Sequence, residues 1–532
     1  MGDVAQVVAD SFVWVIAALA LYTVLINTSY LGLIGAAFLD LRRYRARVDF
    51  ANYDEWFRDP NVHSVSVLIP AHNESAGILT TITAMSSLHY PDYEVVVIDD
   101  GSKDDTAELL ITHLGMVEVP LLATNALPTK GTVTSTWMAK RGNITVTLVR
   151  SSGGGKADAL NVGINYARKE LVCCLDADSL LESTALLQVT RPFAERPNVV
   201  ATGGVIRVAN GAEVSAGRVV TPRIPFSFLT AVQVVEYMRA FFIGREGWSK
   251  VGGLIIISGA FGVVRTSTLV TIGGYAVDCI GEDAELIVRL HRHLHESGDD
   301  DRAEVVMVPE PVAWTEVPTS TRVLSRQRRR WHRGLSDVFN RHRRMVGNPR
   351  YGFVGVVTMP WFLAFELLAP VVELGGYLYL ALVLTLGSSN SALSSTVGPD
   401  ALDLGVTIGG LNWPVATALI GATLLYSVVI TLLALLAEEL TFARYRTNRD
   451  LTMALAGIVG ENLGFRQLTL WWRVRGLVDG FRNRPTVWGD MERAGFGGTA
   501  EAPPAVAEVA ARREREAAAL VQVAADDGPP PR

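Results

Sequence analysis

The stretch YEVVVIDDGSKDDTAELL, from Tyr93 to Leu110, decides the fold that the sequence predicts. Its first half is a run of mostly β-branched apolar residues, which is typical of a strand buried on both faces of a sheet. A polar turn follows, and apolar residues then return at a spacing that fits a helix. A strand, a turn and a helix in this order form the repeating unit of an α/β fold with a parallel sheet.

Apolar strands that end in polar turns recur in three other parts of the chain, which are HSVSVLIPAHNE (63–74), ITVTLVRSSGGGKADALNVGINYARK (144–169) and ELVCCLDADS (170–179). We therefore expect an α/β domain whose parallel sheet is covered by helices on both faces. The segment from Leu109 to Asn143 has weak periodicity and is expected to be a surface insertion.

Polar side chains follow the expected strands at their carboxyl ends, where open α/β sheets bind their ligands. These residues are Asn73, Glu74, Asp99, Asp100, Asp176 and Asp178. We expect them to form the functional site.

Three apolar stretches flank this domain. Ser11 to Leu39 and Trp413 to Leu436 contain no charged residue, and Phe353 to Gly387 contains only Glu366 and Glu373. Each stretch reaches the roughly 20 residues that a membrane-spanning helix needs. The sequence therefore predicts three spans.

The distribution of basic residues predicts the orientation of these spans. Four arginines lie within eight residues after Leu39, and ARYRTNRD follows the third span, whereas the loop around Asn390 has no Lys or Arg. Because basic residues mark the cytoplasmic side, we expect the N-terminus outside and the α/β domain in the cytosol, at the cytoplasmic membrane.

The stretch from Leu451 to Val474 is apolar but is interrupted by Glu461, Asn462, Arg466 and Arg473. Charges at bilayer depth are costly, so we expect an interfacial amphipathic helix here, with a fourth span as the alternative.

The formal net charge of −6 on 532 residues argues against a nucleic-acid partner. The stretch SRQRRRWHRG, from Ser325 to Gly334, nevertheless places five arginines around a tryptophan. Arginine forks suit phosphate, and outer arginines of this region can also hold anionic lipid headgroups.

Asp176 and Asp178 are two residues apart and, on an extended chain, point to the same side. Such a pair can hold Mg²⁺ or Mn²⁺ together with substrate phosphates. The alternative is a polar turn at the end of a strand.

Three further motifs each allow a structural and a functional interpretation. The acids of DDGS cap a helix or bind a nucleoside. The glycines before Lys156 allow a close approach to the start of a helix, which favours anions. They do not match the P-loop pattern. Glu282 and Asp283, in GED, cap a helix or supply a general base.

Taken in order, HNE, DDGS, GGKADALN, DAD, GED and QRRRW resemble the motifs of the family 2 glycosyltransferases. The chain is most similar to their membrane-embedded processive branch, which contains cellulose, hyaluronan, chitin and poly-N-acetylglucosamine synthases. The resemblance implies a GT-A fold, a nucleotide-sugar donor (usually a UDP-sugar), a divalent metal, and hexosyl or N-acetylhexosaminyl transfer with inversion.

The resemblance also implies roles for single residues. Asp99 or Asp100 would bind the nucleoside with Asn73 and Glu74, and Lys156 would lie near the diphosphate. Asp178 would bind the metal, and Asp176 would bind the metal, donor sugar or nucleotide. Asp283, with Glu282 beside it, would be the base. Gln327 and Trp331 would bind the acceptor, and Arg330 the leaving diphosphate.

Near the C-terminus, PTVWGDMERAGF is similar to the gating loop of hyaluronan synthases, which makes Trp488 and Arg493 candidate donor-binding residues. The position before Glu282 departs from the family, because Gly281 replaces the usual Thr or Ser. Three spans are few for a polymer channel, so a homo-oligomer or an accessory partner is a further expectation.

The sequence leaves two other functions open besides polysaccharide synthesis. One is a non-processive transferase that glycosylates a lipid carrier, and the other is a non-enzymatic membrane receptor with a degenerate transferase domain. The expected parts are a first span with its basic flank (1–48), a GT-A domain (49–350), two spans with an outside loop (351–440), an interfacial helix with a gating-loop-like segment (441–496) and a disordered tail (497–532).

Overall fold

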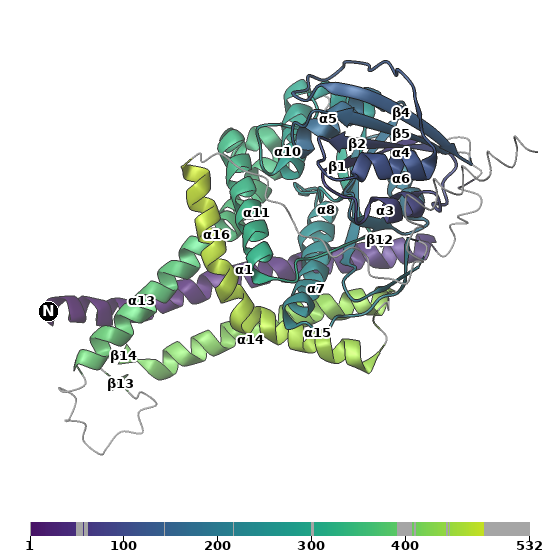
Figure 1. The fold of residues 1–532 in the computed structure, drawn as a ribbon. Helices are drawn as coiled ribbons and strands as arrows, with labels where there is room; N and C mark the ends of the chain where they lie inside the picture. The colour runs from purple at the N-terminus through teal and green to yellow at the C-terminus, as the bar shows by residue number, and fades with distance from the viewer. Residues whose placement is uncertain are drawn as a thin grey trace, which may run out of the picture.

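The computed structural model of the chain describes residues 2–48, 57, 62–142, 144–215, 217–298, 303–390, 407–408, 411–442, 445 and 447–482. Within these residues an α/β domain lies beside a group of long apolar helices (Figure 1). The expected tail and the candidates Trp488 and Arg493 lie outside the described residues.

A ten-stranded sheet forms the centre of the α/β domain in the described part of the chain, with the order β3-β4-β5-β2-β1-β6-β11-β8-β12-β7. Its strands are β1 (Val65–Ala71), β2 (Tyr93–Asp100), β3 (Val117–Glu118), β4 (Val133–Arg141), β5 (Ile144–Ser151), β6 (Leu171–Leu175), β7 (Ser179–Leu181), β8 (Val199–Val208), β11 (Phe261–Arg265) and β12 (Glu304–Thr315). The four strands that the sequence predicted are β1, β2, β5 and β6, and they pair in parallel. Every residue of β2 is buried, as its apolar run predicted.

The sheet is mixed, so the expectation of a purely parallel sheet was wrong outside this central part. Strand β11 runs antiparallel to both β6 and β8, and β4 runs antiparallel to β5. Between β8 and β11 the chain makes a long excursion through residues 209–260 and returns at the carboxyl end of β6, where Phe261 pairs with Leu175. Strand β11 therefore begins at the edge of the sheet where the parallel strands end, and it runs against them.

The segment from Leu109 to Asn143 is not a surface insertion. It completes α4 (Thr106–Leu114) and supplies β3 and β4 at the edge of the sheet. Strand β4 is only partly buried, which explains its weak periodicity. Helices α3 (Ile78–Met85), α5 (Lys156–Tyr166), α6 (Ala185–Glu195), α9 (Thr266–Thr271) and α10 (Glu282–Ser297) complete the domain.

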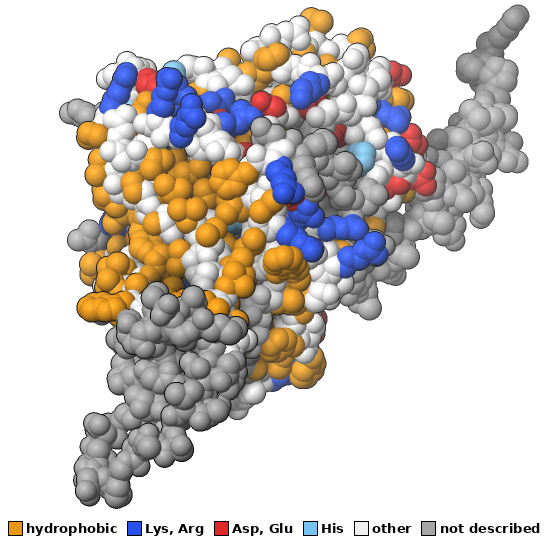
Figure 2. Space-filling model, turned by 90° about the vertical axis from the view of Figure 1, so that its left-hand side faces the viewer, with side chains coloured by type: hydrophobic (Ala, Val, Ile, Leu, Met, Phe, Trp, Pro, Cys, Tyr) orange, Lys and Arg blue, Asp and Glu red, His pale blue; other side chains and the backbone are white. Residues whose placement is uncertain are grey.

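Three segments among the described residues are long and apolar enough to cross a membrane, and they coincide with the predicted spans: Trp14–Leu41, Val354–Leu382 and Thr417–Ala437. They belong to α1 (Gly2–Val48), to a series that ends in α13 (Ala369–Asn390), and to α14 (Trp413–Phe442). Figure 2 shows hydrophobic side chains gathered on one broad face of the molecule. An apolar surface of this kind fits a membrane environment.

Leu451 to Val474 does not form one continuous helix. The chain forms α15 (Asn448–Gly460), a π-helical segment η8 (Glu461–Phe465) and α16 (Arg466–Phe481). The helical path breaks inside η8, where Gly464 has a φ of 127°, a conformation that favours glycine. As a result α15 packs beside α7 (Phe228–Phe241), and α16 packs beside α11 (Thr321–Arg341) (Figure 1).

Candidate active site

One cavity of about 1370 Å³ extends from the carboxyl ends of the central strands to the apolar helices. Its first part, the strand-end region, is lined by the ends of β1, β2 and β6 and by the starts of α5 and α10, together with Arg245, Glu316 and Arg330. Its second part, the vestibule, is lined by α7, α11, α13, η8 and α16. The vestibule continues between the candidate spans, where Asn27 and Ser427 line the cavity.

Asp100 shapes the strand-end region by holding the glycine-rich loop before α5. Its two carboxylate oxygens accept hydrogen bonds from the amides of Gly154 (2.8 Å) and Gly155 (2.9 Å). Burial raises the pKa of this carboxyl, while the two hydrogen bonds oppose that rise. The loop is thereby fixed beside Lys156, the first residue of α5.

Asp99 lies outside the residues that line the cavity. Its carboxylate accepts from the amide of Ser102 at 3.1 Å and lies 3.5 Å from Nε of Arg150. Neighbouring residues of a strand point to opposite faces, so Asp99 and Asp100 cannot both face the cavity. Asn73 and Glu74 do line it, and Asn73 also accepts from the amide of Lys103 at 2.8 Å.

Asp176 and Asp178 both line the cavity, but in a turn and not on an extended strand as expected. The amide of Ser179 donates to the carbonyl of Asp176 at 3.0 Å and closes this turn. Lys156 lies against it, because its Nζ donates to Oδ1 of Asp176 at 2.5 Å and to the carbonyl of Gly259 at 3.0 Å. The pair of acids and the lysine form one charged group.

Burial, together with the charge of Asp176, raises the pKa of Asp178 to about 7. Two carboxylates that repel each other in a partly buried place suit a hard cation, because the cation removes the repulsion. Among the described residues no group of three or more His, Cys, Asp or Glu side chains is arranged so that it could hold a metal ion. A cation held by one or two carboxylates typically completes its ligands with water and substrate phosphate oxygens.

Glu282 and Asp283 occupy the first turn of α10, where the helix dipole favours negative charge. Oδ2 of Asp283 accepts from the amide of Gly259 at 2.9 Å, so Gly259 connects this acid to Lys156. Burial raises the pKa of Glu282 to about 7, against the positive charges of Lys156 and Arg330. Two acids beside a cation can accept a proton from a bound hydroxyl.

The start of α10 lies directly against α11. A Cβ atom at Gly281 would lie 3.1 Å from backbone atoms of Gly334, and one at Gly334 would lie 2.9 Å from Gly281. Gly281, which departs from the expected Thr or Ser, thus permits a close contact between these two helices. This contact brings Asp283 near the QRRRW stretch.

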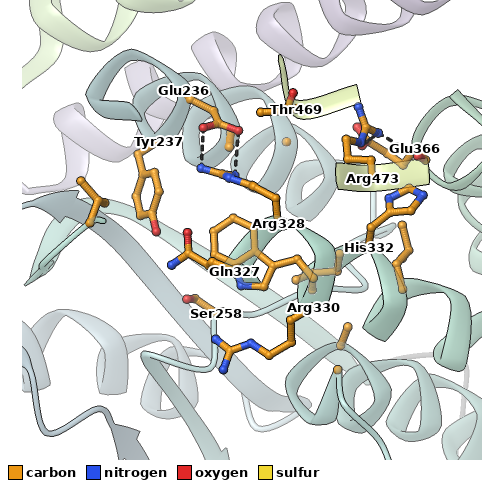
Figure 3. Close-up of a pocket in the computed structure, with 18 of the residues that line it drawn as sticks. Glu236, Tyr237, Ser258, Gln327, Arg328, Arg330, His332, Glu366, Thr469 and Arg473 are labelled. Carbon is orange, nitrogen blue, oxygen red and sulfur yellow. Dashed lines mark hydrogen bonds and ion pairs between the residues drawn. The ribbon is translucent and has the colours of Figure 1, made fainter. Parts of the chain in front are cut away.

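Gln327, Arg330 and Trp331 lie on one face of α11, at the spacing i, i+3 and i+4, and all three line the cavity. Trp331 is 43% exposed, whereas Gln327 is buried. Figure 3 shows that Arg330 extends towards Ser258 while Arg328 extends the other way, to Glu236. Arg328 and Arg330, two positions apart on α11, therefore line different parts of the cavity.

The sequence did not identify the charged residues of the vestibule. They form four pairs, which are Glu236–Arg328, Glu461–Arg239, Glu373–Arg466 and Glu366–Arg473. A signal was present, because Glu366 and Glu373 interrupt an apolar span, and Glu461, Arg466 and Arg473 interrupt the apolar stretch from Leu451 to Val474. Their pairing could not be read from either stretch alone.

Comparison with known proteins gives a consistent result. A family model described as "Glycosyltransferase like family 2" matches residues 60–334. A poly-β-1,6-N-acetyl-D-glucosamine synthase of Staphylococcus epidermidis is 28% identical over 280 residues, which cover 53% of this chain and 56% of the relative. The synthase of Staphylococcus aureus is 26% identical over the same shares. The chain thus matches little more than half the length of these relatives.

A solved mannosyltransferase from Pyrobaculum calidifontis, in complex with GDP-Man and Mn²⁺, is 16% identical with a TM-score of 0.48. The likeness covers 88% of this chain and 100% of the mannosyltransferase. The family match extends over more than half of the chain and includes every motif from HNE to QRRRW. The chain therefore belongs to glycosyltransferase family 2, and its α/β domain is a GT-A glycosyltransferase domain.

Proposed function

We propose that the protein transfers a sugar, with inversion, from a UDP-sugar to a growing polysaccharide at the cytoplasmic face of the membrane. The observation that carries this proposal is the continuous cavity, which joins strand-end carboxylates to the candidate spans past an exposed tryptophan. A soluble acceptor would need no route into the apolar helices.

The donor binds in the strand-end region. Asn73 and Glu74 face the nucleoside, and Asp100 holds the glycine-rich loop next to it. Asp176 and Asp178 fit Mg²⁺ or Mn²⁺, because they are adjacent, partly buried carboxylates with a raised pKa at Asp178. When bound, this cation would neutralise charge on the diphosphate, and Lys156 and Arg330 would add fixed positive charge beside it.

Asp283 acts as the general base. It removes the proton from an acceptor hydroxyl while that oxygen attacks the anomeric carbon of the donor sugar, and the bond from this carbon to the diphosphate breaks. A single displacement on the opposite face inverts the anomeric centre. Arg330 stabilises the negative charge that develops on the departing diphosphate.

The acceptor lies on Trp331, with Gln327 beside it, and extends into the vestibule. Hydroxyl and amide groups continue the path between the spans, where Asn27 donates to Ser427 at 2.9 Å and Thr423 lines the cavity. Polar groups that face an interior path within a membrane are characteristic of substrate pathways. This lining supports a saccharide acceptor that is exported during synthesis, in preference to the apolar chain of a lipid carrier.

The test is a screen of radiolabelled UDP-sugars with the purified full-length protein in lipid nanodiscs, with Mg²⁺ or Mn²⁺ and with chelator. UDP-N-acetylglucosamine is the first donor to try, because the staphylococcal relatives are named for its polymer. We expect a cation-dependent product that lengthens with time. A single sugar on an extractable lipid would favour the lipid-carrier transferase, and no transfer from any donor would favour a receptor.

A further inference from the structure

The vestibule is lined by four carboxylates and four guanidinium groups among the described residues, and each carboxylate faces an arginine from another part of the chain. One pair joins α7 to α11, and one joins α7 to η8. The other two join α16 to the span that ends in α13. The eight paired side chains make the walls of the vestibule strongly polar, and together they carry no net charge.

Two of the pairs are tight, and one of them lies against the tryptophan. Arg328 donates to both oxygens of Glu236 at 2.8 and 2.7 Å (Figure 3), and its guanidinium carbon lies 4.4 Å from the centre of the Trp331 ring. Arg239 donates to Glu461 at 2.5 Å. A bidentate pair holds its arginine in one place, so the charge next to the ring is fixed.

The other two pairs are looser and lie on the span. Nε of Arg466 is 3.6 Å from Glu373, and Nη2 of Arg473 is 3.8 Å from Glu366, whose carbonyl it also contacts at 2.9 Å. Both glutamates fall within the candidate span Val354–Leu382. Charges at this depth are costly and are typical of a substrate pathway.

Attachment of helices does not by itself require such pairs. Replacing a buried ion pair by apolar residues of similar size is often neutral or stabilising. Side chains that keep charged oxygens and N–H groups at the wall of a cavity can also bind hydroxyl groups. Carboxylates accept hydrogen bonds from hydroxyls, and guanidinium groups donate to them.

We infer that the four Glu–Arg pairs form a charge-balanced saccharide site that selects an uncharged acceptor chain. A neutral chain satisfies both kinds of group without disturbing the pairs. A chain that carries carboxylates or amines brings an uncompensated charge into a partly desolvated place, where its burial is costly. This inference rests on the proposed function, because it assumes that the acceptor occupies the vestibule.

The test uses one saccharide backbone with three charges. The probes are β-1,6-linked glucosamine pentasaccharides that carry N-acetyl groups (neutral), free amines (cationic) or N-succinyl groups (anionic). Binding to the purified full-length protein is measured by calorimetry at constant ionic strength. We expect the wild-type protein to bind the neutral probe roughly fivefold or more tightly than either charged probe.

Matched single variants should shift this selectivity in opposite directions. Glu373→Gln leaves the charge of Arg466 uncompensated and should raise relative affinity for the anionic probe. Arg466→Gln should raise it for the cationic probe, and the double variant should restore the preference for the neutral one. Each shift should be roughly fivefold. Glu366→Gln and Arg473→Gln form a second pair of variants if the first does not fold.

If the pairs were purely structural, the variants would have a lower melting temperature. Their affinities for the three probes would then change equally, whatever the sign of the probe's charge. Equal binding of the three probes, binding of none, or shifts in the same direction for both single variants would overturn the inference. Failure of the proposed function is a separate result, because it would appear as absence of glycosidic product with every UDP-sugar, whatever the binding ratios.

Discussion

The strand-end region and the vestibule belong to one cavity but differ in charge. Described residues that line the strand-end region include seven carboxylates and three cations, which are Glu74, Asp100, Asp176, Asp178, Glu282, Asp283 and Glu316 against Lys156, Arg245 and Arg330. In the vestibule four carboxylates balance four arginines. An excess of carboxylates suits a divalent cation and proton transfer, whereas a balanced wall suits a neutral, hydroxyl-rich chain. This difference is the one that the proposed donor and acceptor sites require, so variants at each end should have different effects.

The largest effect should come from Asp283→Asn. The amide keeps an oxygen for the amide of Gly259 but cannot accept the proton, so turnover should fall roughly 10²–10⁴-fold while UDP-sugar affinity changes little. Turnover is measured by radiolabel transfer and affinity by calorimetry. Asp278→Asn, at an exposed acid that pairs with Arg341, is the control. Turnover above about a tenth of wild type would exclude Asp283 as the base.

Asp178→Asn should abolish the part of donor binding that depends on the cation. The loss should be at least roughly tenfold in UDP-sugar affinity with Mn²⁺ present, and smaller with chelator. Asp92→Asn, at an exposed acid that pairs with Lys169, should behave as wild type. If Asp178→Asn binds the donor equally well in both conditions, the strand-end region does not hold its cation there.

A pair of variants on α11 tests whether the boundary between the two regions falls at QRRRW. Trp331→Ala should suppress polymer formation while it spares UDP-sugar binding, because in the proposed function the exposed ring stacks on the acceptor. Arg330→Ala should weaken UDP binding by about tenfold and should also lower turnover, because it removes a positive charge that would lie beside the leaving diphosphate. Product sizing and UDP titration measure the two effects. Polymer of normal length from Trp331→Ala would favour the lipid-carrier transferase.

Much of the strand-end region could be predicted because its residues come from local patterns. Apolar runs identified β1, β2, β5 and β6, and the acids that follow them lie at one edge of the sheet. The direction of β11 was not predictable, because it depends on an excursion through residues 209–260. Asp99 could have been separated from Asp100, since adjacent strand residues face opposite sides.

The vestibule was largely hidden from sequence reasoning. Glu236 and Arg328 are separated by 92 positions, and Arg239 and Glu461 by 222. No local period connects residues so far apart. The charges within the apolar stretch from Leu451 to Val474 predicted an interfacial helix, and the structure gives each of them an ion-pair partner on another segment, which the sequence did not predict. Opposite charges in two separate apolar stretches of one chain therefore indicate pairing as well as position.

The smallest expected effect is a pH dependence confined to the strand-end region. Burial raises the pKa of Asp178 to about 7, well above the value of about 4 that an unfolded aspartate has. Between these values the folded, metal-free protein binds more protons than the unfolded chain, so its stability falls as pH rises through this window. A cation that binds the ionised carboxylates should reverse this loss. The melting temperature gained from Mn²⁺ should accordingly be larger at pH 8 than at pH 6, by about 2–4 °C. Scanning fluorimetry at three pH values measures this gain.

Asp178→Asn should flatten the pH dependence, and Glu373→Gln should leave it unchanged. A gain from Mn²⁺ that is equal at pH 6 and pH 8 would show that the cation does not bind titrating carboxylates.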